Sequence, residues 1–122
     1  MVAEELRAEF YFAEQFARPL ANSLFPISYR IPETLRGAIC GKRVVVVDDV
    51  INAGSAVRGA IEDVEACGAR IVGIGALMTL GSVASEFAAS KGVPLNTLAQ
   101  IVNNALWEPS SCPLCAAGVP LD

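Results

Sequence analysis

The chain has 122 residues, enough for one hydrophobic core and too few for two domains. A hydrophobic content of 53% and a charged content of 18% exclude intrinsic disorder. The net charge of −4 argues against nucleic acid as a partner, because binding to phosphate backbones requires a basic surface. Histidine is absent from the sequence, which excludes imidazole catalysis and histidine metal ligands.

The sequence predicts a cytoplasmic protein that binds no membrane. No apolar stretch reaches the roughly 18 residues needed to cross a bilayer. The segment from Met1 to Glu5 has acids where a signal peptide has a basic region. Four cysteines fit a reduced compartment better than a disulfide scaffold: Cys40, Cys67, Cys112 and Cys115.

The first third of the chain shows weak periodicity. We expect the tail of a helix from Val2 to Glu9 and a short strand from Phe10 to Ala13. Residues 14–36 contain prolines, few periodic apolar residues and isolated charges, which predicts a long mobile loop. Within that loop, Phe25 to Ile31 is compatible with an edge ribbon.

The middle of the chain has clearer signals. The continuous apolar run from Val44 to Val47 is typical of a strand buried on both faces of a parallel sheet. Apolar residues recur at helical spacing from Ala56 to Cys67, and Gly68 follows where a left-handed cap would end the helix.

The same alternation continues towards the C-terminus. We expect a strand from Ile71 to Thr79, a helix from Ser82 to Ser90 with Ser82 as its N-cap, and a strand from Leu95 to Val102. Strand–helix–strand–helix–strand order predicts right-handed crossovers and a parallel sheet. The fold class is therefore α/β, with residues 1–122 forming a single domain.

Two carboxylates stand where the central strand ends. Asp48 and Asp49 lie at its carboxyl end, where open α/β sheets bind their ligands. The small residues from Asn52 to Ser55 then allow backbone N–H groups to approach an anion at the start of a helix. The two carboxylates can accept hydrogen bonds from sugar hydroxyls, and the backbone N–H groups can donate to a phosphate. This combination suits a sugar phosphate as the ligand.

Two other interpretations of the acid pair exist. Phosphoacceptor receiver domains also carry adjacent acids after a strand, but on their first strand, whereas more than forty residues precede Asp48. In a purely structural interpretation, Asp48 caps the next helix and Asp49 is merely solvated. The small-residue loop that follows argues against both.

Residues 44–56 resemble the phosphoribosyl-diphosphate (PRPP) signature of type I phosphoribosyltransferases, most closely that of the orotate enzymes. The resemblance continues through residues 68–77 and 92–95. It resumes in the cysteine-containing tail, residues 104–122, which is similar to the tail of a bacterial and archaeal subset of orotate phosphoribosyltransferases.

The resemblance implies a three-layer open parallel sheet and transfer of ribose 5-phosphate from PRPP to an orotate-like pyrimidine base, with Mg²⁺ as cofactor and release of diphosphate. Asp48 and Asp49 would bind the ribose hydroxyls, directly or through Mg²⁺ and water. Asn52 to Ala56 would hold the 5′-phosphate. The implied PRPP-binding set is Asp48, Asp49, Val50, Ile51, Asn52, Ala53, Gly54, Ser55 and Ala56.

The chain departs from the family pattern near its N-terminus. It begins inside what resembles the family's first helix, so we expect it to lack the first strand, the diphosphate loop and the hood over the base. Gln15 stands where family members carry Lys or Arg. This leaves three cations on the predicted loop: Arg18, Arg30 and Arg36.

A second departure concerns the base. Thr79 and Leu80 stand where related orotate enzymes place Asp-Arg, and that Arg would meet the orotate carboxylate. Two functions therefore remain open: a working transferase, or a binding module that keeps the sugar-phosphate pocket without turnover. In either case we expect a homodimer or higher homo-oligomer, because the sheet would otherwise expose apolar surface.

The remaining candidates are weaker. Cys112 and Cys115 have the spacing of half a zinc site, which a second copy would have to complete; a reduced dithiol or a tail contact is the alternative. Trp107 is interpreted as an anchor for the tail. Arg58 is interpreted as a solvated residue rather than a phosphate ligand.

Overall fold

The computed structural model describes residues 2–17, 27–102, 107 and 110–120. The helices are α1 (Val2–Glu5), α2 (Glu33–Ile39), α3 (Ser55–Ala66), α4 (Val83–Lys91) and α5 (Pro113–Ala116). The strands are β1 (Glu14–Ala17), β2 (Ile27–Arg30), β3 (Arg43–Ile51), β4 (Arg70–Leu80) and β5 (Leu95–Ile101). None of the helices in these ranges has the length and apolar character needed to cross a bilayer.

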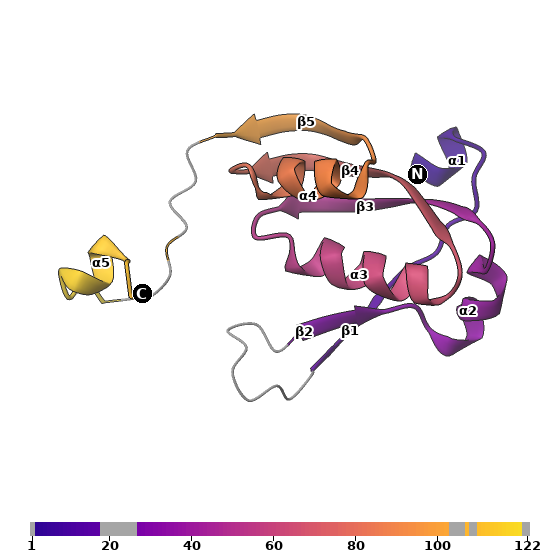
Figure 1. Ribbon diagram of the computed structural model, residues 1–122, viewed down its shortest axis with the longest axis horizontal. Helices are drawn as coiled ribbons and strands as arrows, with labels where there is room; N and C mark the ends of the chain where they lie inside the picture. Colours follow the sequence, from indigo (N-terminus) through magenta and orange to yellow (C-terminus); the bar gives the residue numbers. More distant parts are fainter. Residues whose placement is uncertain (1, 18–26, 103–106, 108–109, 121–122) are drawn as a thin grey trace.

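A parallel sheet in the order β3-β4-β5 forms the centre of the molecule (Figure 1). The predicted bounds of β4, β5, α3 and α4 are confirmed to within one residue, whereas β3 continues through Asp48 and Asp49 to Ile51, four residues beyond the predicted run. Gly68 ends α3 in the left-handed conformation (φ 81°), as predicted. Ser82 occupies the predicted N-cap position of α4, but its side chain does not cap the helix.

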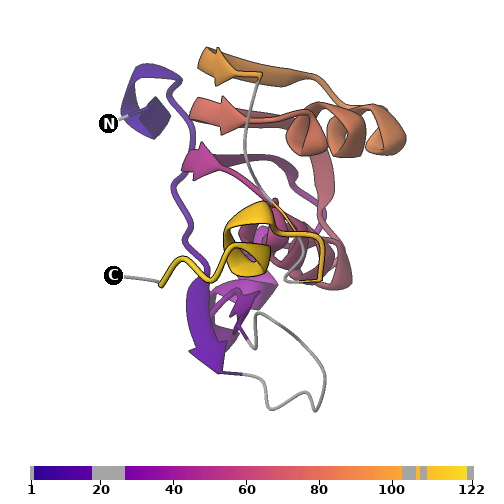
Figure 2. The same cartoon turned by 90° about the vertical axis from the view of Figure 1, so that its left-hand side faces the viewer.

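Both long helices cover the same face of the sheet. Right-handed crossovers that step in one direction, from β3 to β4 to β5, place α3 and α4 on one side, and Figure 2 shows α1 on the other. The core between the sheet and these helices is built around Ile61, Ile74 and Ile51.

The opposite face is largely open, which corrects the expectation of a strand buried on both faces. Val45 and Val47 are 50% and 55% exposed, whereas Val44 and Val46 pack against the core. Leu77 on β4 and Leu98 on β5 are exposed as well. In a run of valines, alternate residues pack on the core and the others leave the outer face of the strand apolar.

The N-terminal third is more regular than its sequence predicts. Residues 10–13 form no strand; β1 begins at Glu14 instead and pairs antiparallel with β2. The ribbon expected within residues 25–31 is therefore present as β2, but it belongs to a separate two-stranded sheet. Helix α2 occupies the end of the predicted loop, while residues 18–26 of that loop lie outside the described ranges.

A carboxylate of α3 adds hydrogen bonds to the apolar packing that joins this third of the chain to the core. The Oδ2 atom of Asp63 accepts the Ile31 backbone N–H at 2.8 Å and the Arg36 Nη1 at 2.8 Å. Ile31 is buried, so water cannot replace Asp63 as the acceptor of the Ile31 N–H. Asp63 thereby joins α3 to the segment between β2 and α2 and to α2 itself.

We predict that Asp63→Ala destabilises the protein by about 1–3 kcal/mol, because the buried Ile31 N–H loses its acceptor. Glu62→Ala, at the exposed neighbouring position of α3, is the matched control and should change stability little. Urea unfolding of the two variants measures the difference. Equal midpoints for both variants would contradict this role for Asp63.

Candidate functional site

The site lies at the carboxyl end of β3, beside β4. Asp48 is paired with Ala76 and Val50 with Met78 in the parallel register. The arrowheads of β3, β4 and β5 point to the same end of the sheet in Figure 1, and the loop from β3 into α3 leaves from that end. The structure therefore places the predicted acids and the predicted loop at one edge.

The two acids differ in their surroundings. Burial alternates along β3 up to Asp48, which is half-buried on the inner row with Val44 and Val46, whereas Asp49 is exposed. The Oδ1 atom of Asp48 accepts the Asp49 N–H at 3.0 Å, and the Oδ1 atom of Asp49 accepts the Val50 N–H at 2.7 Å.

Desolvation raises the pKa of Asp48 above its ordinary value, although the hydrogen bond from the Asp49 N–H lowers it in part. A partly desolvated carboxylate with an acidic neighbour stabilises the fold less when it is ionised. Such a group is characteristic of sites that bind a ligand rather than of structural ion pairs. Asp48 is not the N-cap residue of α3, because Gly54 occupies that position.

Gly54 makes the turn from the strand into the helix. Its φ of 76° and ψ of 10° lie in the left-handed region, which a residue without a Cβ adopts at low cost. Its carbonyl accepts the Arg58 N–H at 2.9 Å, so α3 begins directly after it. The first amides of an α-helix have no acceptor within the helix, and Gly54 at the N-cap position of α3 has no side chain that could accept from them.

These amides, at the start of a 12-residue helix, form a cradle for an anion. Ser55 is exposed at the first helical position, with Ala56 next to it. Behind the loop the molecule is apolar, so the loop rests on the core rather than on a polar cavity. The lining there consists of Ile51, Gly54, Val57, Ile74, Val83, Ala84 and Phe87.

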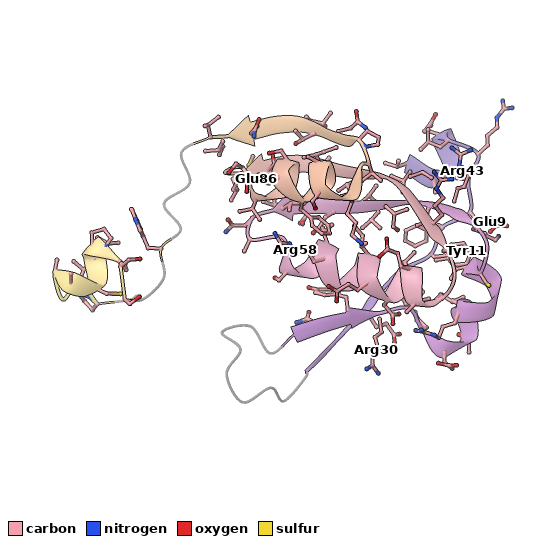
Figure 3. The ribbon with its side chains drawn as sticks, in the orientation of Figure 1. Glu9, Tyr11, Arg30, Arg43, Arg58 and Glu86 are labelled. Carbon is pink, nitrogen blue, oxygen red and sulfur yellow. The ribbon has the colours of Figure 1, made fainter. Side chains whose placement is uncertain are left out.

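Arg58 is exposed, as the sequence interpretation expects, and lies beside Gly54. Its guanidinium carbon is 5.0 Å from the centroid of the Phe87 ring, and a Cβ placed on Gly54 would lie 3.8 Å from Arg58 Nε. Figure 3 shows Arg58 and Glu86 towards the end of the sheet where β3 ends, and Glu9, Tyr11 and Arg43 at the other end. In the sequence, the position of Arg58 four residues after Gly54 indicates that it lies near the start of the helix.

The cations expected on the loop are not gathered at this edge. Arg36 belongs to α2 and is held by Asp63, a contact that raises the pKa of the Arg36 guanidinium. Arg30 lies on the exposed ribbon and Gln15 is exposed on β1, while Arg18 falls outside the described ranges. The expectation that Arg36 is a loop cation is therefore wrong.

The end of β4 offers no charge for a base. Leu80 is half-buried, and Thr79 is fully buried beside Ile51 in the β3–β4 register. The Thr79 hydroxyl has no hydrogen-bond partner among the described residues. In the tail, Trp107 is about half exposed.

Within the described ranges, no three or more His, Cys, Asp or Glu side chains are grouped so as to hold a metal ion. The donors at the site are the two carboxylates of Asp48 and Asp49, which are hard oxygen ligands. Mg²⁺ commonly takes one or two carboxylates and completes its shell with water and substrate phosphate oxygens. The residues present thus fit Mg²⁺ brought by a diphosphate ligand.

A helix start beside paired carboxylates at the edge of a parallel α/β sheet fits a sugar phosphate, and comparison with known proteins shows the family. A family model described as "Phosphoribosyl transferase domain" matches residues 7–108. The chain therefore belongs to the type I phosphoribosyltransferase family.

The similar relatives and solved structures include orotate and adenine phosphoribosyltransferases. Orotate phosphoribosyltransferase of Caldanaerobacter subterraneus subsp. tengcongensis is 33% identical over 81 residues, 66% of this chain and 40% of that protein. The structure of orotate phosphoribosyltransferase from Aeropyrum pernix matches with a TM-score of 0.59 at 26% identity, covering 83% of this chain and 52% of that one. Adenine phosphoribosyltransferase from Rhodothermus marinus shares the fold, with a TM-score of 0.65, 24% identity and coverage of 83% and 61%.

The chain spans 40–42% of the length of the curated orotate phosphoribosyltransferases that it matches. The likeness therefore shows the family and the fold. Structures of an orotate and of an adenine phosphoribosyltransferase match the chain similarly well, so membership of the family does not by itself say which base is used.

We predict that Asp48→Asn stabilises the fold at neutral pH. The raised pKa means that ionised Asp48 is unfavourable in the folded state, so its contribution to stability is present at acidic pH and lost as the pH rises through the folded-state pKa. Asn keeps an acceptor for the Asp49 N–H without the charge.

Urea unfolding at acidic and neutral pH should show the advantage of Asp48→Asn growing with pH. Glu86→Gln, on the exposed face of α4, is the control for loss of a carboxylate and should show no such trend. A constant difference between Asp48→Asn and the wild type across this pH range would contradict the prediction.

Proposed function

We propose that this chain binds PRPP and acts as a phosphoribosyltransferase, transferring ribose 5-phosphate to an orotate-like pyrimidine base with release of diphosphate. The protein would act in pyrimidine nucleotide biosynthesis in the cytoplasm. The observation that carries the proposal is the left-handed turn at Gly54, which presents the start of α3 beside Asp48 and Asp49. The identity to orotate enzymes over two thirds of the chain supports the choice of base.

Each part of the site has a role in this proposal. Asp48 and Asp49 accept hydrogen bonds from the ribose hydroxyls. The amides of residues 52–56, with the Ser55 hydroxyl, bind the 5′-phosphate, and Val50 and Ile51 fix the end of the strand beneath it. Arg58, held over the Phe87 ring, adds positive charge near the phosphate.

Asp48 and Asp49 would hold Mg²⁺ through water, and the ion would neutralise the negative charge of the diphosphate when bound. The chain itself contributes orientation. By fixing both the ribose hydroxyls and the 5′-phosphate, the site would leave the anomeric carbon facing the incoming base.

The domain organisation remains part of the proposal: one domain over residues 1–122, with a tail at about 104–122. We further propose a homodimer. Its support is the open apolar face of the sheet, which carries Val45, Val47, Leu77 and Leu98. Association would remove this surface from water.

A second candidate is a pentose-phosphate-binding module without turnover. Two observations favour it: Arg36 is engaged by Asp63 rather than available to a leaving diphosphate, and Leu80 offers no charge to an orotate carboxylate. Losing a charged partner for a carboxylate typically costs about 1.5–3 kcal/mol.

Isothermal titration separates the two candidates. The transferase proposal predicts that PRPP with Mg²⁺ binds at least about tenfold more tightly than ribose 5-phosphate, a difference of roughly 1.4 kcal/mol, and that omitting Mg²⁺ removes this advantage. Equal, weak binding of both ligands would favour the binding module. Binding of neither ligand would contradict both.

A further inference from the structure

Two cysteines in the C-terminal segment are not part of the sugar-phosphate site. Cys112 directly precedes α5 and Cys115 lies within it. The Cys115 backbone N–H donates to Cys112 Sγ at 3.4 Å, which turns this sulfur back over the helical turn towards Cys115. Both thiols are free; Cys115 is exposed and Cys112 is half-buried.

The contact between the two residues makes the thiols unequal. Hydrogen bonds from the Cys115 backbone N–H and thiol lower the pKa of Cys112, and the same thiol contact raises the pKa of Cys115. At a given pH, a larger fraction of Cys112 than of Cys115 is therefore the reactive thiolate. Burial instead raises the pKa of Cys67, so that thiol is less reactive.

Metal binding is the main competing use of such a pair. Structural zinc sites take four protein ligands, histidine is absent, and no third ligand lies near the pair in the described ranges. A metal would need a second copy of the chain, whereas sulfur–sulfur chemistry needs only the two thiols already in contact.

We propose that Cys112 and Cys115 form a thiol–disulfide exchange site that accepts a small-molecule disulfide such as glutathione disulfide. The Cys112 thiolate attacks one sulfur of that disulfide, forming a mixed disulfide and releasing one glutathione thiolate. Cys115 then loses its proton to water and attacks Cys112 Sγ, closing the Cys112–Cys115 bond and releasing the second thiolate. Two electrons pass to glutathione disulfide, and the two protons from the cysteines end on the two glutathione thiols.

The geometry permits closure. Residues three apart on a helical turn have Cβ atoms about 5–6 Å apart, and a disulfide requires roughly 3.5–4.5 Å. A movement of one or two ångströms within α5 would bring the two Cβ atoms into this range. Helix α5 permits such a movement because it is a single turn of four residues with no buried side chain. The site is independent of the sugar-phosphate pocket, so neither proposal depends on the other.

The test uses the full chain incubated with glutathione disulfide and followed by intact-protein and peptide mass spectrometry. The wild type should form the Cys112–Cys115 disulfide. Cys115→Ser should accumulate glutathione at Cys112, because the resolving thiol is missing, and Cys112→Ser should react at Cys115 about tenfold or more slowly. Cys40→Ser and Cys67→Ser are matched controls that should behave as the wild type.

Alkylation by iodoacetamide across pH provides a second readout, in which Cys112 should react at lower pH than Cys115. Far-UV circular dichroism of each variant checks that the fold is retained. Equal glutathionylation of the two single variants would overturn the proposal. Uptake of Zn²⁺ by the reduced protein at one ion per two chains, with protection of both thiols from glutathione disulfide, would also overturn it in favour of a shared metal site.

Discussion

The site depends on the conformation of one residue between β3 and α3. At Gly54 the chain must reverse from an extended strand into a helix within three residues, and it does so through the left-handed region. That turn brings the first amides of α3 to the edge of the sheet where β3 ends, shortly after Asp48 and Asp49. Donors for an anion and acceptors for hydroxyls are thus fixed by backbone geometry, with few side chains involved.

This arrangement has a cost in stability that the rest of the fold offsets. Asp48 is partly desolvated with an acidic neighbour, and Gly54 at the N-cap position of α3 has no side chain that could accept from the first amides. Behind the loop, Ile51, Val57 and Phe87 form an apolar support, and Phe87 also holds Arg58 next to Gly54. A bound sugar phosphate would supply the missing hydrogen bonds and the counter-charge for the helix start. Groups that are unfavourable in the free protein are thereby explained by binding.

The sequence predicted the central β3–α3–β4–α4–β5 unit because its signals are local: a valine run, apolar residues at helical spacing, and glycines after the helices. It failed where stability comes from distant contacts. Ile31 and Ile39 pack into the core, and Asp63 hydrogen-bonds Ile31 and Arg36, which lie 32 and 27 positions away in the sequence. The packing of Arg58 on Phe87 is likewise tertiary. The four valines could not reveal that one face of β3 is open, because a run of valines fits either situation.

The central claim is that the backbone conformation at Gly54 creates the phosphate site. The most direct measurement is the affinity for ribose 5-phosphate, by isothermal titration, of the wild type, Gly54→Val and Gly37→Val. Gly37 is an exposed helical glycine with open space around its Cβ position, so its substitution controls for adding a side chain. The account predicts at least about a tenfold loss for Gly54→Val and no change for Gly37→Val. Replacing both Asp48 and Asp49 by alanine provides a variant that leaves the turn intact and should also lose affinity. Unchanged affinity in the folded Gly54→Val protein and in the double alanine variant would contradict the account.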